Sequence, residues 1–318
     1  MKIGYLSLTE FCPNRCLACP CESSGRSDAR ELGVERVFDD IRRAEAEGGI
    51  DRLILSGGEP TFHSRFMAVM EFLGKYSFPV SLTTTSERFA DPTFLRDVLE
   101  VFPASRLSVT TALHSFDPVV HDAMTRTAGS FSRWFGGLQA LEAHGVSSTL
   151  KHLLARPTIG ALSRFVAEFY HRFAPTTSLF LCGLDFSGMA AQNRDRVFLT
   201  YSEIRDRLQP ALDVVLEHRA EGDSRPVWVL DLPLCVVDLP YHPFFPASGA
   251  APAGLVFYDA PDYDAPLFGD KVPVRQTHPS EVCEACLKRD VCRGTWGSAL
   301  KCHEPSEYRA ISEVVGHV

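Results

Sequence analysis

The stretch that decides the fold and chemistry of this chain is Phe11-Cys12-Pro13-Asn14-Arg15-Cys16-Leu17-Ala18-Cys19. Its cysteines follow a C-x3-C-x2-C spacing directly after Ile3–Thr9, a run typical of a β-strand. Thiolates are the standard ligands of iron–sulfur clusters. Three of them on one loop can each bind a different iron of a [4Fe–4S] cubane, which leaves the fourth iron open to a ligand. A zinc knuckle with Cys21 as a fourth thiolate is the alternative from spacing alone.

Outward from this loop, short β-branched or apolar runs alternate with amphipathic stretches, the pattern of βα units. The expected strands are Ile3–Thr9, Arg52–Leu55, Pro79–Thr85, Leu107–Leu113, Ser148–Leu154 and Ser178–Leu184. The expected helices are Val34–Glu47, Arg65–Tyr76, Pro92–Phe102, Phe131–His144 and Ala161–Phe173. Parallel neighbours need long crossovers, and six units are too few for a closed eight-stranded barrel. The pattern therefore predicts an α/β fold, a partial (β/α)6 TIM barrel over residues 1–188.

Residues 189–318 are expected to form a C-terminal extension. Ser202–Arg219 has a helical pattern, and Val227–Leu230 looks like one more strand. From Leu232 to Pro279 the chain is rich in Pro, Gly, Ala and Asp, with little periodicity. Such an irregular segment needs anchoring, and Cys235 and Cys283 stand on either side of it.

Composition excludes several classes of protein. The chain has 318 residues, 45% of them hydrophobic, and a formal charge of -8, which argues against broad attraction to nucleic acid or an acidic membrane. No apolar run approaches the roughly 18–20 residues of a membrane span, and the N-terminus does not read as a signal peptide. We therefore expect a cytoplasmic protein, where ten cysteines are more often metal ligands than disulfides.

A second motif, Ser56-Gly57-Gly58-Glu59-Pro60-Thr61, stands at the end of the second expected strand. Its two glycines would let the backbone approach a ligand closely, Glu59 could add a charge, and Pro60 would stiffen the exit.

Together the two motifs resemble the radical S-adenosylmethionine (radical SAM) superfamily, over roughly Ile3 to Asp185. The resemblance implies that Cys12, Cys16 and Cys19 hold a [4Fe–4S] cluster whose open iron is chelated by S-adenosylmethionine. Residues Gly57, Gly58, Glu59 and Pro60 would form the strand end that contacts the methionine amino group. One electron, from a donor such as flavodoxin or ferredoxin, would lead to a 5′-deoxyadenosyl radical that abstracts a substrate hydrogen.

Other cofactor contacts follow less directly from the resemblance. The family often has an aromatic residue where this chain has Ala18, and Asn-Gly where it has Thr84-Thr85-Ser86. The hydroxyls of Thr84 and Ser86 are candidates for the ribose or the carboxylate. Lys151, within the fifth expected strand, would either meet the methionine carboxylate or reach solvent.

Two residues are candidates for catalysis. His114 lies in Leu113-His114-Ser115-Phe116-Asp117, which looks like the fourth βα unit of peptide-modifying members, and Cys182 ends the sixth expected strand. Cys182, like Cys21, could donate a hydrogen atom to a substrate radical. The alternatives are a packed histidine and a buried apolar thiol.

A second cysteine group, Cys283-x2-Cys286-x5-Cys292, lies far from the first. With Cys235 as a fourth thiolate it could close a second, auxiliary [4Fe–4S] cluster, and Cys302 could replace Cys235 or add to it. Zinc is the alternative metal. The pattern over Leu230 to Trp296 resembles the radical maturases of the His-Xaa-Ser peptide system and the shortened auxiliary-cluster domains of other peptide maturases.

Three functions remain open from the sequence. The first is radical modification of a ribosomally made peptide by crosslinking, epimerisation or oxidation. Because the first strand begins at residue 3, this would call for a separate leader-recognition protein, or none. The second is the same chemistry on a small metabolite, in cofactor or natural-product biosynthesis. The third is a non-catalytic zinc-binding protein.

Overall fold

The main sheet has seven strands in the order β1 to β7, and every neighbouring pair is parallel. The computed structural model describes residues 3–21, 28–246, 276–277 and 280–312. Its strands are β1 (Ile3–Thr9), β2 (Arg52–Gly57), β3 (Val80–Thr83), β4 (Leu107–Ala112), β5 (Ser147–Leu153), β6 (Ser178–Cys182) and β7 (Val227–Leu230). Because β1 and β7 stand at opposite ends of this order, the sheet is an open, partial barrel, which confirms the predicted fold class.

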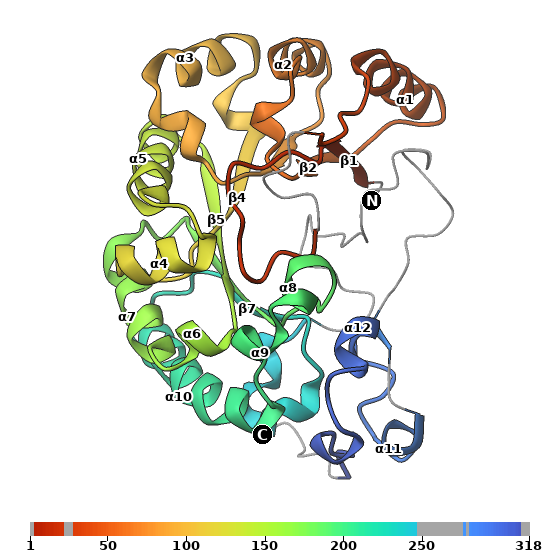
Figure 1. Ribbon diagram of the computed structural model, residues 1–318, viewed down its shortest axis with the longest axis vertical. Helices are drawn as coiled ribbons and strands as arrows, with labels where there is room; N and C mark the ends of the chain where they lie inside the picture. Colours follow the sequence, from red (N-terminus) through yellow and green to blue (C-terminus); the bar gives the residue numbers. More distant parts are fainter. Residues whose placement is uncertain (1–2, 22–27, 247–275, 278–279, 313–318) are drawn as a thin grey trace.

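Helices follow the strands and lie in an arc on the outer side of the sheet, from α1 through α3, α5 and α7 to α10 (Figure 1). The barrel helices are α1 (Val34–Ala46), α2 (Phe66–Gly74), α3 (Pro92–Val101), α4 (Pro118–Thr125), α5 (Ser130–Ala143), α6 (Arg156–Ile159), α7 (Leu162–Arg172), α8 (Gly188–Gln192), α9 (Arg194–Val197) and α10 (Tyr201–Ala220). Short 3-10 turns η1 (Pro60–Phe62), η2 (Glu87–Ala90) and η3 (Ala104–Arg106) lie among them.

The sheet has one apolar and one polar face, because successive strand residues point to opposite sides. Leu53, Leu82 and Val109 are buried in the main core with the apolar faces of the outer helices, and each such burial stabilises the fold by roughly 1.5–3 kcal/mol. On the other face the Ser81 and Ser108 hydroxyls lie 2.8 Å apart. The inner side of the barrel can therefore accommodate a polar ligand.

Residues beyond 188 complete the sheet. Strand β7 pairs with β6, and α10 packs on α7, so the sheet extends past the boundary expected at residue 188. The N-terminus of α10 is fixed by a capping box between Thr200 and Glu203.

The rest of the extension comprises η4 (Leu234–Val236), η5 (Leu239–Phe244), α11 (Ser280–Glu284), α12 (Gly297–Leu300), η6 (Pro305–Glu307) and the antiparallel pair β8 (Gln276–Thr277) and β9 (Thr295–Trp296). Of the segment Leu232–Pro279 that was expected to be irregular, residues 247–275 and 278–279 lie outside the described residues. Among the described helices, none combines the length and apolar character that crossing a bilayer requires.

Candidate functional site

The three-cysteine loop follows β1 and is held by backbone hydrogen bonds on both sides. Cys12 is buried, while Cys16 and Cys19 are half-buried. On one side the loop bonds to the end of α4, and on the other to α8. The bonds are Arg15 N to Thr125 O (3.0 Å), Leu17 N to Met124 O (2.8 Å) and Ala190 N to Cys19 O (3.0 Å). These contacts place the loop at the carboxyl ends of the parallel strands, where barrels of this kind carry their chemistry.

The three thiols share one electrostatic neighbourhood. Burial raises the pKa of Cys12, and the negative charges of Glu59 and Cys16 raise it further. Burial, reinforced by Cys19, raises the pKa of Cys16 to about 12. A coordinated metal reverses this preference, because a metal-bound thiol is deprotonated outright. The backbone N–H of Cys21 donates to Cys19 Sγ at 3.4 Å, the type of bond that tunes cluster sulfurs.

The spacing of these thiols bears on the zinc alternative. Within the described residues, no three His, Cys, Asp or Glu side chains are grouped so that they could hold one metal ion. A structural zinc site needs four ligands around one point. A cubane places a different demand on the loop, because each thiolate binds its own iron. The donor set therefore fits a cluster better than a zinc ion.

Gly57 and Gly58 let the end of β2 pack directly on this loop. An added Cβ would overlap the carbonyl oxygen of Thr9 at Gly57 and that of Phe11 at Gly58. Gly57 also has a φ of 133°, which side chains rarely adopt. The N–H groups of Gly58 and Glu59 donate to Thr9 O and Phe11 O, each at 2.6 Å. The glycines are thus required by the cysteine loop itself.

Glu59 joins the ends of two strands. It is fully buried, and its carboxylate accepts hydrogen bonds from the Thr61 hydroxyl at 2.6 Å and the Thr84 hydroxyl at 2.7 Å. The backbone N–H of Thr85 donates to its other oxygen. Ser86 has a φ of 57°, and its hydroxyl donates to Thr85 O at 2.7 Å. The hydroxyls of Thr84 and Ser86, singled out from the sequence, are therefore used within the fold.

Three buried polar atoms near this loop have no hydrogen-bond partner among the described residues. They are Ser7 Oγ on β1, Asn14 Oδ1 on the cysteine loop and Thr85 Oγ1 after β3. A buried polar atom without a partner costs about 1–3 kcal/mol, so such atoms are usually satisfied by water or a ligand. They fit a cofactor with polar ends. The sequence identified Thr85 only through its neighbours, because a strand end does not reveal which of three hydroxyls is left unbonded.

Lys151 lies inside the barrel among negative groups. Burial acts to lower the pKa of Lys151, but the charges of Cys182, Asp231 and Asp185, with a smaller contribution from Cys19, outweigh it and raise that pKa. This cation therefore stays charged next to the three-cysteine loop. Asp185 and Asp231 were not singled out from the sequence, although each stands just after a parallel strand, which was the available signal.

The two candidates for catalysis differ in their surroundings. Cys182 is fully buried beside Phe180 and Leu230, and burial raises its pKa to about 12 despite the nearby Lys151. His114 instead packs against His121, with ring centroids 5.4 Å apart, and it borders a cavity of about 400 Å³ between α4 and α7. Burial places the pKa of His114 well below its usual value. These contacts favour a packed, neutral histidine.

The second cysteine group lies within electrostatic range of Cys235, which is in η4. Burial raises the pKa of Cys235 to about 11, and the charges of Cys292, Cys283 and Cys286 add to this effect. Backbone N–H groups donate to the sulfurs: Leu234 N to Cys292 Sγ (3.4 Å), Gly294 N to Cys292 Sγ (3.3 Å) and Ile311 N to Cys286 Sγ (3.4 Å). Four thiols in one neighbourhood, with N–H donors to two of them, suit a four-cysteine cluster.

Cys302 lies in other surroundings. It packs against the small apolar cluster that contains Leu17, Phe186 and Val197, and the charge that acts on its thiol is that of Arg194. The structure therefore groups Cys235, and not Cys302, with the other three thiols.

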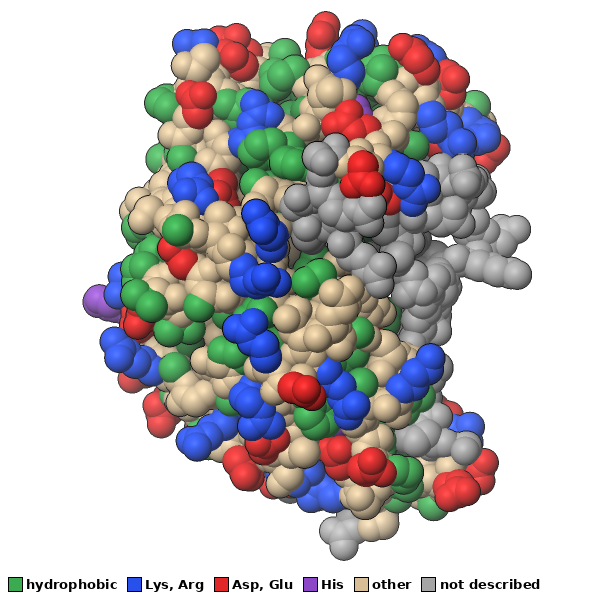
Figure 2. Space-filling model, in the orientation of Figure 1, with side chains coloured by type: hydrophobic (Ala, Val, Ile, Leu, Met, Phe, Trp, Pro, Cys, Tyr) green, Lys and Arg blue, Asp and Glu red, His purple; other side chains and the backbone are tan. Residues whose placement is uncertain are grey.

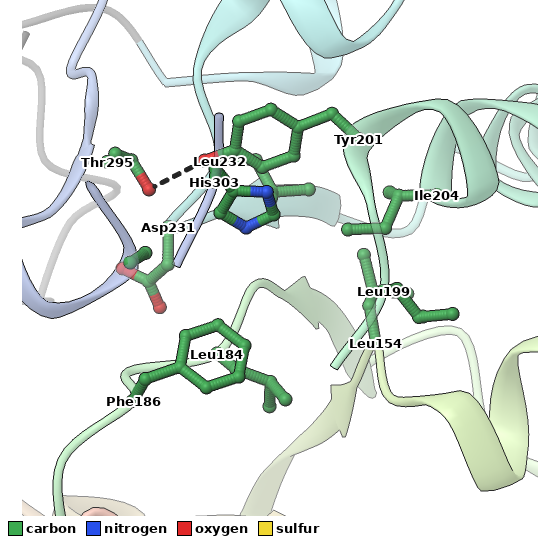
Figure 3. A pocket seen from close by; sticks show the side chains of 11 residues that line it. Leu154, Leu184, Phe186, Leu199, Tyr201, Ile204, Asp231, Leu232, Thr295 and His303 are labelled. Atoms are coloured by element: carbon green, nitrogen blue, oxygen red, sulfur yellow. Dashed lines mark hydrogen bonds between the residues drawn. The ribbon is translucent and has the colours of Figure 1, made fainter. Parts of the chain in front are cut away.

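A small cavity marks the junction between barrel and extension (Figure 3). It measures about 10 Å³, room for roughly one water molecule. Figure 3 shows the Tyr201 hydroxyl bonded to Thr295 and the Tyr201 ring beside His303, with Asp231 and Phe186 on other walls. The cavity is too small for a nucleotide-sized ligand, so it belongs to the docking of the extension.

Comparison with known proteins identifies the part of the chain that carries the cysteine loop. Residues 6–156 match the family described as the radical SAM superfamily. This part of the chain is a radical SAM domain. The family uses a [4Fe–4S] cluster and S-adenosylmethionine, and the three thiols and the unpaired polar atoms of the radical SAM domain fit both groups.

Curated relatives of the chain include two cyclases. A probable GTP 3′,8-cyclase of Thermococcus kodakarensis is 27% identical over 46% of this chain, and the GTP 3′,8-cyclase of Rhizobium etli is 24% identical over 71%. The matches span 43% and 65% of the lengths of these relatives.

Solved structures show the same fold. Streptococcus suis SuiB bound to precursor peptide SuiA has a TM-score of 0.60 at 12% identity, over 98% of this chain and 75% of that chain. Native anSMEcpe with bound AdoMet and Cp18Cys peptide has a TM-score of 0.55 at 13% identity, over 71% and 62% of the two chains.

Proposed function

We propose that this protein is a radical SAM enzyme that reductively cleaves S-adenosylmethionine and abstracts a hydrogen from a ribosomally made peptide, which it crosslinks, epimerises or oxidises. The observation that carries the peptide is the fold likeness to peptide-bound SuiB, which covers 98% of the chain and so includes the C-terminal extension. The cyclase relatives match at most 72% of the chain.

Each part of the site has a role in this proposal. Cys12, Cys16 and Cys19 hold the cluster, and the bound cofactor supplies the radical chemistry. Glu59 fixes the ends of β2 and β3 around it. The Lys151 ammonium neutralises the methionine carboxylate, and Thr85 offers a free hydroxyl. Gly57, Gly58 and Pro60 keep the strand end close to the cysteine loop.

We propose a second [4Fe–4S] cluster on Cys235, Cys283, Cys286 and Cys292. Four protein ligands leave no iron open, so this auxiliary site would accept an electron from a product radical or position the peptide, and would not bind a second S-adenosylmethionine. The role of Cys182 as a hydrogen-atom donor stays a proposal, and its burial beside the barrel interior is compatible with it.

Iron content and cofactor cleavage test the two metal sites. Anaerobically purified protein should be brown, with about eight irons per chain, and should form 5′-deoxyadenosine when reduced. Changing Cys12, Cys16 and Cys19 to Ala should abolish cleavage; persistent 5′-deoxyadenosine would overturn the main proposal. Cys235→Ala should lose about four irons, whereas Cys302→Ala, its matched control, should keep all of them.

The runner-up is a small-metabolite substrate, which the cyclase relatives favour. Deuterium transfer from substrate to cofactor distinguishes a peptide substrate from a small metabolite. A deuterated substrate peptide should pass deuterium into 5′-deoxyadenosine, and deuterated GTP should not. Consumption of GTP with matching 5′-deoxyadenosine formation would establish the metabolite function instead. A leader-recognition protein is a further proposal, and it would be found as a factor that lowers the KM for the peptide.

A zinc protein is the remaining alternative from the sequence. It predicts a colourless protein with zinc at both sites and no cofactor cleavage. Iron–sulfur chemistry also needs thiols kept reduced, so we propose the cytoplasm as its location.

A further inference from the structure

Exposed basic side chains lie on the three-cysteine loop and on segments that hydrogen bonds join to it. We name these residues the basic surface: Arg15, Arg126, Arg194, Arg196 and Lys301, all exposed. Figure 2 shows Lys and Arg side chains gathered in a column on the face where α6, α8 and α9 lie in Figure 1. The chain as a whole carries a formal charge of -8, so this local excess of positive charge stands out from its average.

Hydrogen bonds make the basic surface continuous with the cysteine loop. The bonds are Arg15 N to Thr125 O (3.0 Å), Asn193 Nδ2 to Leu17 O (3.3 Å) and Arg194 Nη2 to Cys302 O (3.1 Å). The first brings the cysteine loop next to Arg126, the second brings it next to α9, and the third joins α9 to Lys301. One hydrogen-bonded surface therefore includes the loop and basic residues from three other segments.

Arg194 is held by its bond to Cys302 O and by the Phe198 ring, but the other four charges are not balanced by any carboxylate that the structure describes. Within the described residues, Arg15, Arg126, Arg196 and Lys301 form no ion pair. Elsewhere on the molecule exposed arginines are paired: Arg164 and Arg172 both bind Glu168. The acidic residues within four positions of these five in sequence are Asp122, Asp195 and Glu304, so basic residues outnumber acidic ones.

We propose that the basic surface docks the acidic protein that supplies the electron for the reaction. The inference rests on the proposed function, which requires a one-electron donor. Arg15 belongs to the same loop as the cluster ligands, so a carrier bound here lies next to the electron's destination. Neither cavity described above includes a residue of the basic surface, which favours a protein partner over a small molecule.

A contact for this role need not be large. Electron-transfer complexes are transient and small, with less than about 1,200 Å² of buried surface. Complementary charge in these complexes mainly accelerates association and orients the partner. The donor is oxidised by one electron and the group held by the three cysteines is reduced by one, with no bond or proton transferred in the docking step.

Charge reversal away from the cysteines tests the inference. The variant Arg126→Glu/Arg196→Glu should raise the KM for an acidic flavodoxin by about tenfold or more and flatten its dependence on ionic strength. With dithionite, which needs no docking, S-adenosylmethionine cleavage should be unchanged. The matched control, Lys75→Glu/Arg207→Glu, alters the net charge equally with exposed residues outside the basic surface, and should keep the wild-type KM.

A binding measurement separates this inference from the proposed function. Affinity for oxidised flavodoxin, followed by flavin fluorescence, requires no turnover, so it reports docking even if cofactor cleavage is never observed. Equal affinities of the variant and the control would overturn the inference. So would a variant that binds flavodoxin normally but loses affinity for an acidic substrate peptide. Failure of dithionite to support cleavage in the wild type would count against the proposed function alone.

Discussion

Glu59 shows how one carboxylate holds the site together. It has no exposed surface, and donors from Thr61, Thr84 and Thr85 all reach it. In Glu59→Gln the amide NH2 would face one of these donors, so at least one bond to a charged acceptor is lost. We expect a loss of about 2–3 kcal/mol in the free energy of unfolding, measured with urea under anaerobic conditions. Glu71→Gln, on an exposed position of α2, is the control; similar losses in both would contradict this account.

At Gly58, a single added methyl group should prevent metal binding by the three-cysteine loop for steric reasons alone. An added methyl group would overlap the backbone at Phe11, and the cysteine loop would have to move. Gly58→Ala should therefore lose the iron held by Cys12, Cys16 and Cys19 while the auxiliary irons stay. Gly33→Ala is the matched control, because a Cβ there meets nothing within 4 Å. Full iron content in Gly58→Ala would show that the loop tolerates displacement.

At the scale of single elements, the N-terminus of α10 should give the fold a measurable pH dependence. The backbone N–H of Thr200, followed by Arg156, lowers the pKa of Glu203 below its usual value near 4.5. A lowered pKa means stability that is present above pH 4.5 and lost as the pH falls through the lower folded value. Glu203→Gln should therefore destabilise the protein at pH 7, and this difference should shrink by pH 4. Glu217→Gln, exposed on the same helix, should show no such trend in urea unfolding.

The strands and long helices could be predicted from the sequence because their hydrophobic period is regular. All seven strands of the main sheet lie within two residues of the expected bounds, including Val227–Leu230, whereas β8 and β9 were not expected. The short helices α4, α6, α8 and α9 were not expected, since four to eight residues give too little periodicity to read. Their positions nonetheless matter, because α4 and α8 hold the cysteine loop.

Parts of the site that depend on the spacing of residues along the chain could be predicted. Parts that depend on the direction in which a side chain points could not. The C-x3-C-x2-C spacing of the first loop can be read from residue order. So can the choice of Cys235 as a candidate fourth thiolate for the group that begins at Cys283. Which hydroxyl after β3 is left unbonded, and that Cys302 lies apart from the second group, depend on packing. His114 illustrates the same limit, because a residue just past a strand end can turn outward to the helix layer.

At the scale of the whole molecule, Tyr201 joins the extension to the barrel. Its hydroxyl donates to Thr295 Oγ1 at 3.0 Å, and its ring stacks on His303 with ring centroids 3.8 Å apart. Its backbone N–H donates to the Glu307 carboxylate at 2.7 Å. Tyr201 is itself only 1% exposed. Removing this side chain therefore removes a contact shared by both parts of the protein.

Tyr201→Ala should cost about 3–5 kcal/mol, the usual penalty for truncating a buried aromatic residue, and most of it should fall on the docked extension. We expect faster cleavage of the extension in limited proteolysis and loss of about four irons, while the three-cysteine loop keeps its own because β1 and α4 still hold it. Tyr241→Ala is the control, since its hydroxyl bonds Asp213 at the surface. Equal loss of iron from both sites would mean that barrel and extension unfold as one cooperative unit, so that the extension has no separable stability.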